Sequence, residues 1–170
     1  MLDLAGIVED SIVDGPGIRC TVFSQGCPHH CPGCHNPETW PFEGGTPVET
    51  EAMVAIVTGN PLCRGVTFSG GEPFAQAEGF LDLAKALKAR GYEVASYSGY
   101  TFEALLHGTA AQRQLLEYID ILIDGPFLQK EKSLELAFRG SANQRILDVP
   151  KSLSAGSAVW VTSPRWLGEY

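Results

Sequence analysis

Three cysteines lie close together in residues 26–40, GCPHHCPGCHNPETW, and their side chains could bind a metal. They are Cys27, Cys31 and Cys34, in a C-x3-C-x2-C spacing that also encloses or adjoins three histidines, His29, His30 and His35. Structural zinc sites usually have four ligands, with their cysteines in two separated pairs, and a [4Fe-4S] cluster normally takes four thiolates. A cluster held by three thiolates would leave one iron open, as catalytic metal sites do.

Protein side chains that could fill the open position lie both outside and inside this segment. Cys20 belongs to an apolar stretch, and an extended chain would place it roughly 20 Å from Cys27. A lone cysteine in an apolar strand typically packs in the core. Cys63 precedes a different strand and is expected at the opposite end of the sheet. The histidines of the segment remain candidates, although such histidines more often support ligands than bind the metal.

Length and charge restrict the class of protein. The chain has 170 residues, of which 44% are hydrophobic and 19% charged, with a net charge of −8. We therefore expect one folded domain, residues 1–170, that binds neither nucleic acid nor an anionic membrane surface. No apolar run approaches the ~18–20 residues of a membrane helix, and the acidic N-terminus does not resemble a signal peptide. Five cysteines, three of them crowded together, favour a cytoplasmic metal site over disulfides.

The hydrophobic pattern alternates between strands and helices. It predicts strands at 18–24, 65–69, 93–98 and 119–123, and helices at 48–58, 75–90 and 102–118, the last interrupted near Gly108. Gly91 is expected to end the second helix. Weaker signals indicate strands at 144–149 and 158–162, separated from the others by a loop-rich region at 130–143.

This alternation predicts an α/β fold with a mainly parallel sheet covered by helices. In such folds the loops after the strands form the site. The segments with chemically useful residues all follow predicted strands: the cysteine loop, 70–72, 98–100 and 124–126. We therefore expect them to converge at one end of the sheet.

The cysteine spacing, together with Gly70-Gly71-Glu72, resembles the radical S-adenosylmethionine enzymes. In that family the amino and carboxylate groups of S-adenosylmethionine chelate the open iron, and the reduced cluster cleaves the sulfonium to give a 5′-deoxyadenosyl radical. Residues 13–40 (VDGPGIRCTVFSQGCPHHCPGCHNPETW) and 66–78 (VTFSGGEPFAQAE) are similar to enzymes that activate glycyl radical enzymes. The stretches YSGYTFEALL, IDILIDGPF and FRGSANQRI, and the short chain, resemble activators of anaerobic ribonucleoside-triphosphate reductase more than those of pyruvate formate-lyase.

The resemblance covers about residues 13–147 and carries expectations for the whole chain. It implies a partial, open (β/α) barrel of the radical SAM type, with a core at about 13–149 and a tail at 150–170. It implies a [4Fe-4S] cluster and S-adenosyl-L-methionine as cofactors. The expected partners are the anaerobic ribonucleoside-triphosphate reductase and a low-potential electron donor such as flavodoxin or ferredoxin.

The resemblance also implies roles for individual residues. The cluster ligands would be Cys27, Cys31 and Cys34. The cofactor-binding residues would be Gly33, Cys34, His35, Gly70, Gly71, Glu72, Ser98 and Asp124. Within this set Glu72 would bind the α-ammonium and the two glycines would lie along the methionine moiety, while Ser98 and Asp124 would face ribose or carboxylate. Many family members have an aromatic residue where this chain has Gly33, so that adenine would contact backbone or His35.

Simpler interpretations stay open for several of these residues. Glu72 could cap the following helix, and Ser98 and Asp124 could form turns. Arg19 is expected to pair with an acidic group. The loop containing Arg139 is expected to lie at the mouth of the site or to contact the partner protein. The simpler interpretation is that it is a solvated loop. No acid/base pair is assigned as catalytic. The alternative functions are an activator of another glycyl radical enzyme and a non-catalytic iron–sulfur or zinc protein, which would need a fourth protein ligand.

Overall fold

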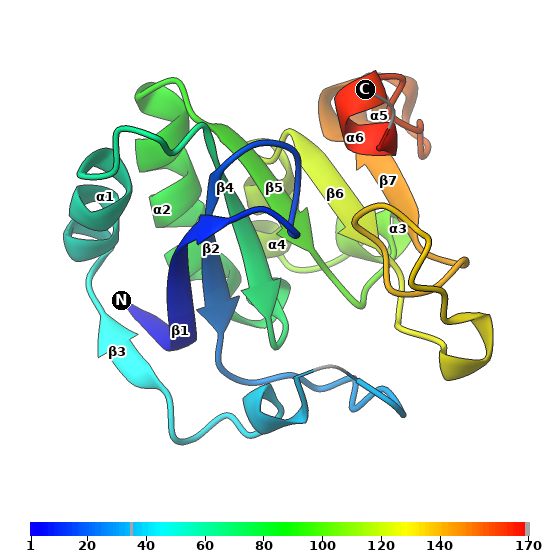
Figure 1. Cartoon of the computed structure of the whole chain (residues 1–170), viewed down its shortest axis with the longest axis horizontal. Helices are drawn as coiled ribbons and strands as arrows, with labels where there is room; N and C mark the ends of the chain where they lie inside the picture. Colours follow the sequence, from blue (N-terminus) through cyan, green and yellow to red (C-terminus); the bar gives the residue numbers. More distant parts are fainter. Residues whose placement is uncertain (35, 169–170) are drawn as a thin grey trace.

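One seven-stranded sheet with helices packed against it makes up the fold of the computed structural model, which describes residues 1–34 and 36–168 (Figure 1). The strands are β1 (Leu2–Ser11), β2 (Arg19–Ser24), β3 (Thr46–Val48), β4 (Gly65–Gly70), β5 (Glu93–Tyr97), β6 (Ile121–Asp124) and β7 (Arg145–Asp148). The α-helices are α1 (Thr50–Thr58), α2 (Ala77–Ala89), α3 (Phe102–Leu106), α4 (Ala110–Leu116), α5 (Val149–Ala155) and α6 (Pro164–Leu167). Three 3-10 helices are η1 (Pro37–Thr39), η2 (Pro73–Gln76) and η3 (Gln129–Glu131).

The strand order across the sheet is β3-β1-β2-β4-β5-β6-β7. Neighbouring strands are parallel from β2 through β4 and β5 to β6. The outer pairings, β1 with β2, β1 with β3 and β6 with β7, are antiparallel. The prediction of parallel strands is therefore confirmed for the centre of the sheet and wrong at its edges. Because β3 and β7 lie at opposite edges, the sheet is open.

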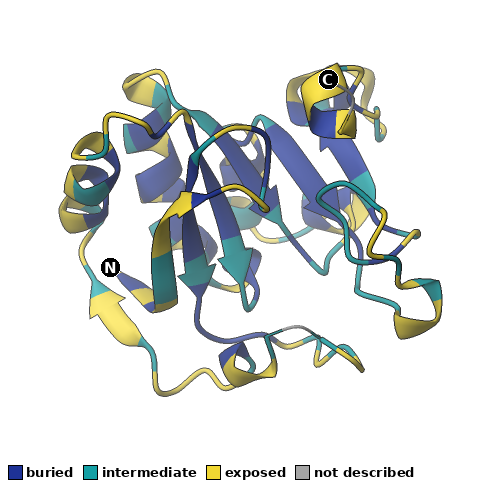
Figure 2. Cartoon of the chain, viewed as in Figure 1, coloured by how far each residue is buried: buried dark blue, intermediate teal, exposed yellow. Residues whose placement is uncertain are grey.

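The two faces of the sheet have different surroundings. Alternate strand residues, including Cys20, Phe68 and Leu122, join side chains of α1 to α4 in the main hydrophobic core. On the other face Thr21, Thr67, Ala95 and Ile121 form one row across β2, β4, β5 and β6. A smaller cluster around Ile123 and Trp166 packs on this second face. Figure 2 shows the central strands buried and the outer surfaces of the helices exposed.

The predicted central elements are confirmed, with shifts of a few residues at their ends. Gly91, with a φ of 84°, follows α2 and ends it as predicted. The predicted interruption near Gly108 is also present, because Thr109 forms a capping box that begins the separate helix α4. No helix among the described residues has the length and apolar character needed to cross a membrane.

The ends of the chain differ from the prediction. The predicted strand at 158–162 is wrong: only Trp160 forms an isolated bridge, to Leu147. The backbone N–H of Val159 donates instead to Ser152 Oγ (2.9 Å), and α6 begins soon afterwards. Sequence patterns also missed β1, β3, α5 and α6. The first of these alternates buried and exposed residues only over Leu2–Leu4, the part that pairs with β3.

Candidate active site

The cysteine loop begins directly after β2 and is closed at its base by backbone hydrogen bonds. The N–H of Gly26 donates to the carbonyl of Thr39 (2.7 Å), and the N–H of Cys27 donates to that of Trp40 (3.0 Å). Inside the loop, Cys34 N–H donates to the Cys31 carbonyl (3.0 Å) in a tight turn. These bonds fix the loop at its two ends, so that its position follows from the end of β2.

The predicted convergence of loops at one end of the sheet is confirmed. A cavity of about 590 Å³ is lined by residues that follow β2, β4, β5 and β6, among them Cys27, Cys31, Cys34, Gly70, Gly71, Ser98, Gly99 and Gly125. In Figure 1 the chain after β2 passes beneath the arrowheads of β2 and β4. All three cysteines of the loop thus face one cavity at the carboxyl ends of the parallel strands.

Glu72 is fully buried next to this cavity and its carboxylate accepts several hydrogen bonds. His29 Nε2 and the Gly99 backbone N–H each lie 2.7 Å from Oε1. Phe74 N–H lies 3.0 Å from Oε2, and Ser98 Oγ lies 2.9 Å from the same oxygen. The simpler interpretation is confirmed in this respect, since Glu72 caps η2 through Phe74. Its Oε1 connects the cysteine loop, through His29, to the segment after β5, through Gly99.

Gly70 and Gly71 bring the end of β4 against the start of the cysteine loop. Gly70 has a φ of 89°, and a Cβ there would lie 2.6 Å from Ser24 N. A Cβ on Gly71 would collide with the Gly26 carbonyl oxygen. The amide of Gly71 donates to Ser24 O and that of Glu72 to Gly26 O, both at 2.8 Å. The close backbone contact explains why glycine is needed at both positions.

The other residues singled out in the sequence lie in different environments. Ser98 lines the cavity and contacts Glu72. The Asp124 carboxylate instead accepts from Phe102 N–H (2.7 Å) at the start of α3 and from Arg145 Nε (3.0 Å), so the contacts of this buried residue give its predicted cofactor role no support. Gly33 has a φ of 75° and lies against the side chain of Gln129. His35 lies outside the described residues.

The Asp14-Gly15-Pro16-Gly17 turn reaches the cavity from the second face of the sheet. Asp14 lines the cavity, and its Oδ2 accepts from Ser11 Oγ (2.8 Å) and Thr21 Oγ1 (3.1 Å). The fully buried Arg19 lies beneath the turn and pairs with Glu93 at 2.8 Å, which confirms the acidic partner expected for it. Sequence analysis included this segment in the family-like stretch 13–40 but did not place it at the cavity.

Two buried polar atoms point to a ligand in the same cavity. Among the described residues, the buried side-chain nitrogens without a hydrogen-bond partner are Trp40 Nε1 and Arg139 Nε, and both side chains line this cavity. Buried donors are normally paired, so an unpaired donor calls for an acceptor supplied from elsewhere. Arg139 also stacks on Trp160 and donates to Gln144 O (3.0 Å), which holds its guanidinium in place.

The thiols suit a cluster better than a single ion. In the described part of the chain, no three His, Cys, Asp or Glu side chains are grouped to hold one metal ion. A [4Fe-4S] cluster has separate irons, so its cysteines do not have to meet at one point. Burial raises the pKa of Cys27, while the backbone amides of His29 and His30 donate to its sulfur and favour the thiolate. Asn36 N–H likewise lies 3.4 Å from Cys34 Sγ. The residues present therefore fit an iron–sulfur cluster with one open iron.

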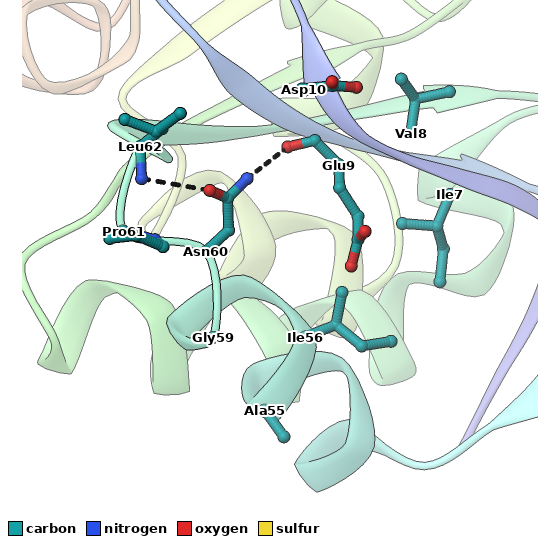
Figure 3. A pocket seen from close by; sticks show the side chains of 10 residues that line it. All are labelled: Ile7, Val8, Glu9, Asp10, Ala55, Ile56, Gly59, Asn60, Pro61 and Leu62. Carbon is teal, nitrogen blue, oxygen red and sulfur yellow. Dashed lines mark hydrogen bonds between the residues drawn. The ribbon is translucent and has the colours of Figure 1, made fainter.

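A second hollow, of about 890 Å³, lies between β1 and α1 (Figure 3). Apolar side chains such as Ile7, Ile56 and Leu62 line it together with Glu9. The Asn60 side chain donates to Glu9 O (2.8 Å) and accepts from Leu62 N–H (3.1 Å). None of the residues that line this hollow carries a thiol or imidazole side chain.

Comparison with known proteins shows the family to which the chain belongs. A family described as a 4Fe-4S single cluster domain matches residues 13–147. A relative from Salmonella typhimurium is 38% identical over 141 residues, covering 78% of this chain and 90% of its own length. A relative from Vibrio cholerae is 36% identical, and the match covers 79% of this chain and 90% of the relative. A relative from Enterobacteria phage T4 is 34% identical, and the match covers 79% of this chain and 86% of the relative. All three are named anaerobic ribonucleoside-triphosphate reductase-activating protein, and the chain belongs to their family.

Proposed function

We propose that this chain is a radical S-adenosylmethionine enzyme that generates a glycyl radical on an anaerobic ribonucleoside-triphosphate reductase. The observation that carries the proposal is the meeting of three cysteines and the buried Glu72 network at one cavity, beyond the ends of parallel strands. The names of the relatives support the choice of protein substrate. A non-catalytic electron carrier would have no use for such a cavity beside its cluster.

The cysteine loop would hold the cluster through Cys27, Cys31 and Cys34. When bound and reduced, the cluster would supply the electron that cleaves S-adenosylmethionine, and this cleavage starts hydrogen abstraction from a glycine Cα. The protein's own part is to bind, orient and exclude water. Trp40 Nε1, buried and unpaired beside the cysteines, offers one donor for a bound group.

Two charged side chains would orient the amino-acid end of the cosubstrate. Glu72 is the acceptor for its ammonium group, and the Arg139 guanidinium, whose Nε is unpaired, is the donor for its carboxylate. Gly71 and Gly99 also line the cavity and add no side chain of their own to its wall. A glycine of the partner can enter such a cavity because its Cα has no side chain.

The open sheet fits a partial (β/α) barrel of the radical SAM type, with β2, β4, β5 and β6 as its parallel strands. We propose that residues 1–170 act as one domain, since Trp166 of the tail is buried against Arg19 at the start of β2. A cytoplasmic location and a flavodoxin or ferredoxin as electron donor remain part of the proposal.

The deciding experiment is anaerobic. The chain is reconstituted with iron and sulfide, reduced with dithionite and mixed with S-adenosylmethionine, and its EPR spectrum is recorded before and after the addition. We expect a [4Fe-4S]1+ signal that shifts on addition, release of 5′-deoxyadenosine, and a glycyl radical signal when the reductase is present. An unshifted signal without product would overturn the proposal in favour of an electron carrier.

Three variants sharpen this experiment. Cys31→Ala should lose the cluster signal, whereas Cys63→Ala, which changes a buried cysteine away from the cavity, should keep it. Glu72→Gln should keep the cluster but lose most of the shift. A radical formed on pyruvate formate-lyase and not on the reductase would reassign the partner while leaving the reaction class intact.

A further inference from the structure

The Glu72 carboxylate already has as many hydrogen-bond donors as it can accept. An ionised carboxylate offers about four lone-pair positions. Four donors approach it: His29 Nε2 and Gly99 N–H at Oε1, and Phe74 N–H and Ser98 Oγ at Oε2. The side chain is 0% exposed. An ammonium group can therefore bind Glu72 only if one of these four donors leaves.

Three of the four donors are held by the fold. The N–H of Phe74 belongs to the first turn of η2, and that of Gly99 to the loop directly after β5. Ser98 is buried, and its Oγ also accepts from Tyr100 N–H (3.0 Å). Moving any of them would disturb the main chain or a second hydrogen bond.

His29 is the donor that can leave. It lines the cavity, its side chain is 17% exposed, and it belongs to the cysteine loop. Its ring lies edge-on to Tyr100 at 4.5 Å and close over Gly99, where a Cβ would lie 2.7 Å from Nε2. Because its bond to Glu72 is made by the side chain alone, a χ1 rotation would release the carboxylate without a change in the main chain.

We propose that His29 is a latch on Glu72, and that the ammonium group of S-adenosylmethionine replaces it as hydrogen-bond donor. The inference rests on the proposed function and adds a residue that controls access to the ammonium site. In the ligand-free protein His29 supplies the fourth hydrogen-bond donor to the buried carboxylate, beside the three that the fold holds in place. Because His29 lies between Cys27 and Cys31 in the chain, the exchange links this site to the cluster-bearing loop.

The latch makes an unusual prediction about affinity. Displacing His29 costs a hydrogen bond to a charged group, so its removal should tighten the binding of S-adenosylmethionine, by about tenfold if that bond contributes ~1.5 kcal/mol. Removing His29 should also lower the stability of the ligand-free protein. If His29 merely supported the site, its removal would instead weaken the binding of S-adenosylmethionine.

The test measures dissociation constants by anaerobic calorimetry on the cluster-loaded protein. His29→Ala, with His29→Ser as a second deletion, should bind S-adenosylmethionine about tenfold more tightly than the wild type. His29→Gln, whose amide reaches as far as Nε2, should be close to wild type. 5′-Methylthioadenosine has no ammonium group, so its affinity should be the same in all variants. His30→Asn is the matched control, because His30 stacks on Trp40 away from Glu72 and has a positive φ that asparagine tolerates.

Thermal unfolding gives a second readout. Both deletions should lower the unfolding temperature without ligand, and saturating S-adenosylmethionine should narrow the difference from wild type. Equal or weaker binding by the deletions would overturn the latch while leaving the proposed function in place. If the wild type binds 5′-methylthioadenosine but not S-adenosylmethionine, or binds neither, the proposed function fails and the latch with it.

Discussion

Backbone contact at Gly71 sets the distance between the two loops that build the cavity. The Gly71 Cα faces the Gly26 carbonyl, which is itself fixed by the Glu72 amide at 2.8 Å. A neighbour of this kind cannot move aside as the end of a flexible side chain can. Residue identity at this point therefore controls the site through sterics, separately from any role in binding.

Gly71→Ala should lower the free energy of unfolding by about 1–3 kcal/mol, because the added methyl overpacks against backbone. Urea denaturation followed by circular dichroism measures the change. Gly6→Ala is the matched control: a Cβ at Gly6 meets nothing within 4 Å, and its effect should stay within about 0.5 kcal/mol. Equal effects of the two substitutions would contradict the steric account.

Cysteine reactivity should separate the site thiols from the core thiols. Cys20 is 1% exposed, and burial, with Cys63 and Glu9 nearby, raises its pKa to about 12. Alkylation requires the thiolate. In cluster-free protein at pH 8, we expect iodoacetamide to label Cys31 and Cys34 but not Cys20, as mapped by mass spectrometry. All three cysteines should react when the protein is unfolded in urea. If Cys20 of the native protein were labelled as fast as Cys31, the result would show that β2 opens.

At the scale of elements, the tail supports the turn that enters the cavity from the second face. The Trp166 ring in α6 packs over the Arg19 guanidinium at 5.1 Å and edge-on to Phe138 at 5.5 Å. A Cβ on Gly15 would lie 2.9 Å from its Cη2. The last helix thus packs on the first parallel strand and on the turn that carries Asp14.

Trp166→Ala should cost about 3–5 kcal/mol of unfolding free energy, since it removes a fully buried aromatic ring and exposes a buried arginine. Trp160→Ala is the control, because Trp160 is 42% exposed and should cost much less. Trp166→Phe should recover most of the loss. A tail that contributed nothing to the fold would give the same urea midpoint for all of these proteins.

The fold was predictable where local pattern and tertiary packing agree. The four parallel strands are short apolar runs, each followed by a glycine within two residues, and sequence patterns located each of them. β1 was missed because its residues alternate between buried and exposed over only a short part of the strand. The false strand at 158–162 has strand-forming residues, but Ser152 takes the Val159 amide and prevents a ladder. Competition for a backbone amide by a side chain outside the strand leaves no pattern in the residues of the strand itself.

The same distinction applies to the site. The thiols and the Gly-Gly-Glu segment were found because their spacing is local, and strand order then implied that they meet. The contact between His29 and Glu72 spans 43 residues and carries no spacing signal. Asp124 looked like a site residue because it follows a strand, yet Arg145 and Phe102 occupy its oxygens. Position along a strand predicts proximity to a site but not the direction of a side chain.

On the scale of the whole molecule, the cavity is open where two apolar segments reach solvent. Val13 is 71% exposed and Leu134 is 89% exposed, and both also line the cavity. Residues that line a cavity and face solvent mark its mouth. Exposed apolar side chains around such a mouth are typical of interaction sites. Under the proposed function, the partner's glycine would enter the cavity through this mouth.

Leu134→Asp should therefore separate the cleavage of S-adenosylmethionine from the formation of the glycyl radical on the reductase. Release of 5′-deoxyadenosine with dithionite alone should be unchanged, because the Leu134 side chain is 89% exposed and so makes few contacts inside the cavity. Formation of the glycyl radical on the reductase, followed by EPR against reductase concentration, should require about tenfold more partner, as expected for loss of ~1.4 kcal/mol of apolar contact. Leu62→Asp is the matched control, since Leu62 is 61% exposed but lines the other hollow (Figure 3). If both variants activate the reductase equally well, the partner approaches the cavity by a route that avoids Leu134.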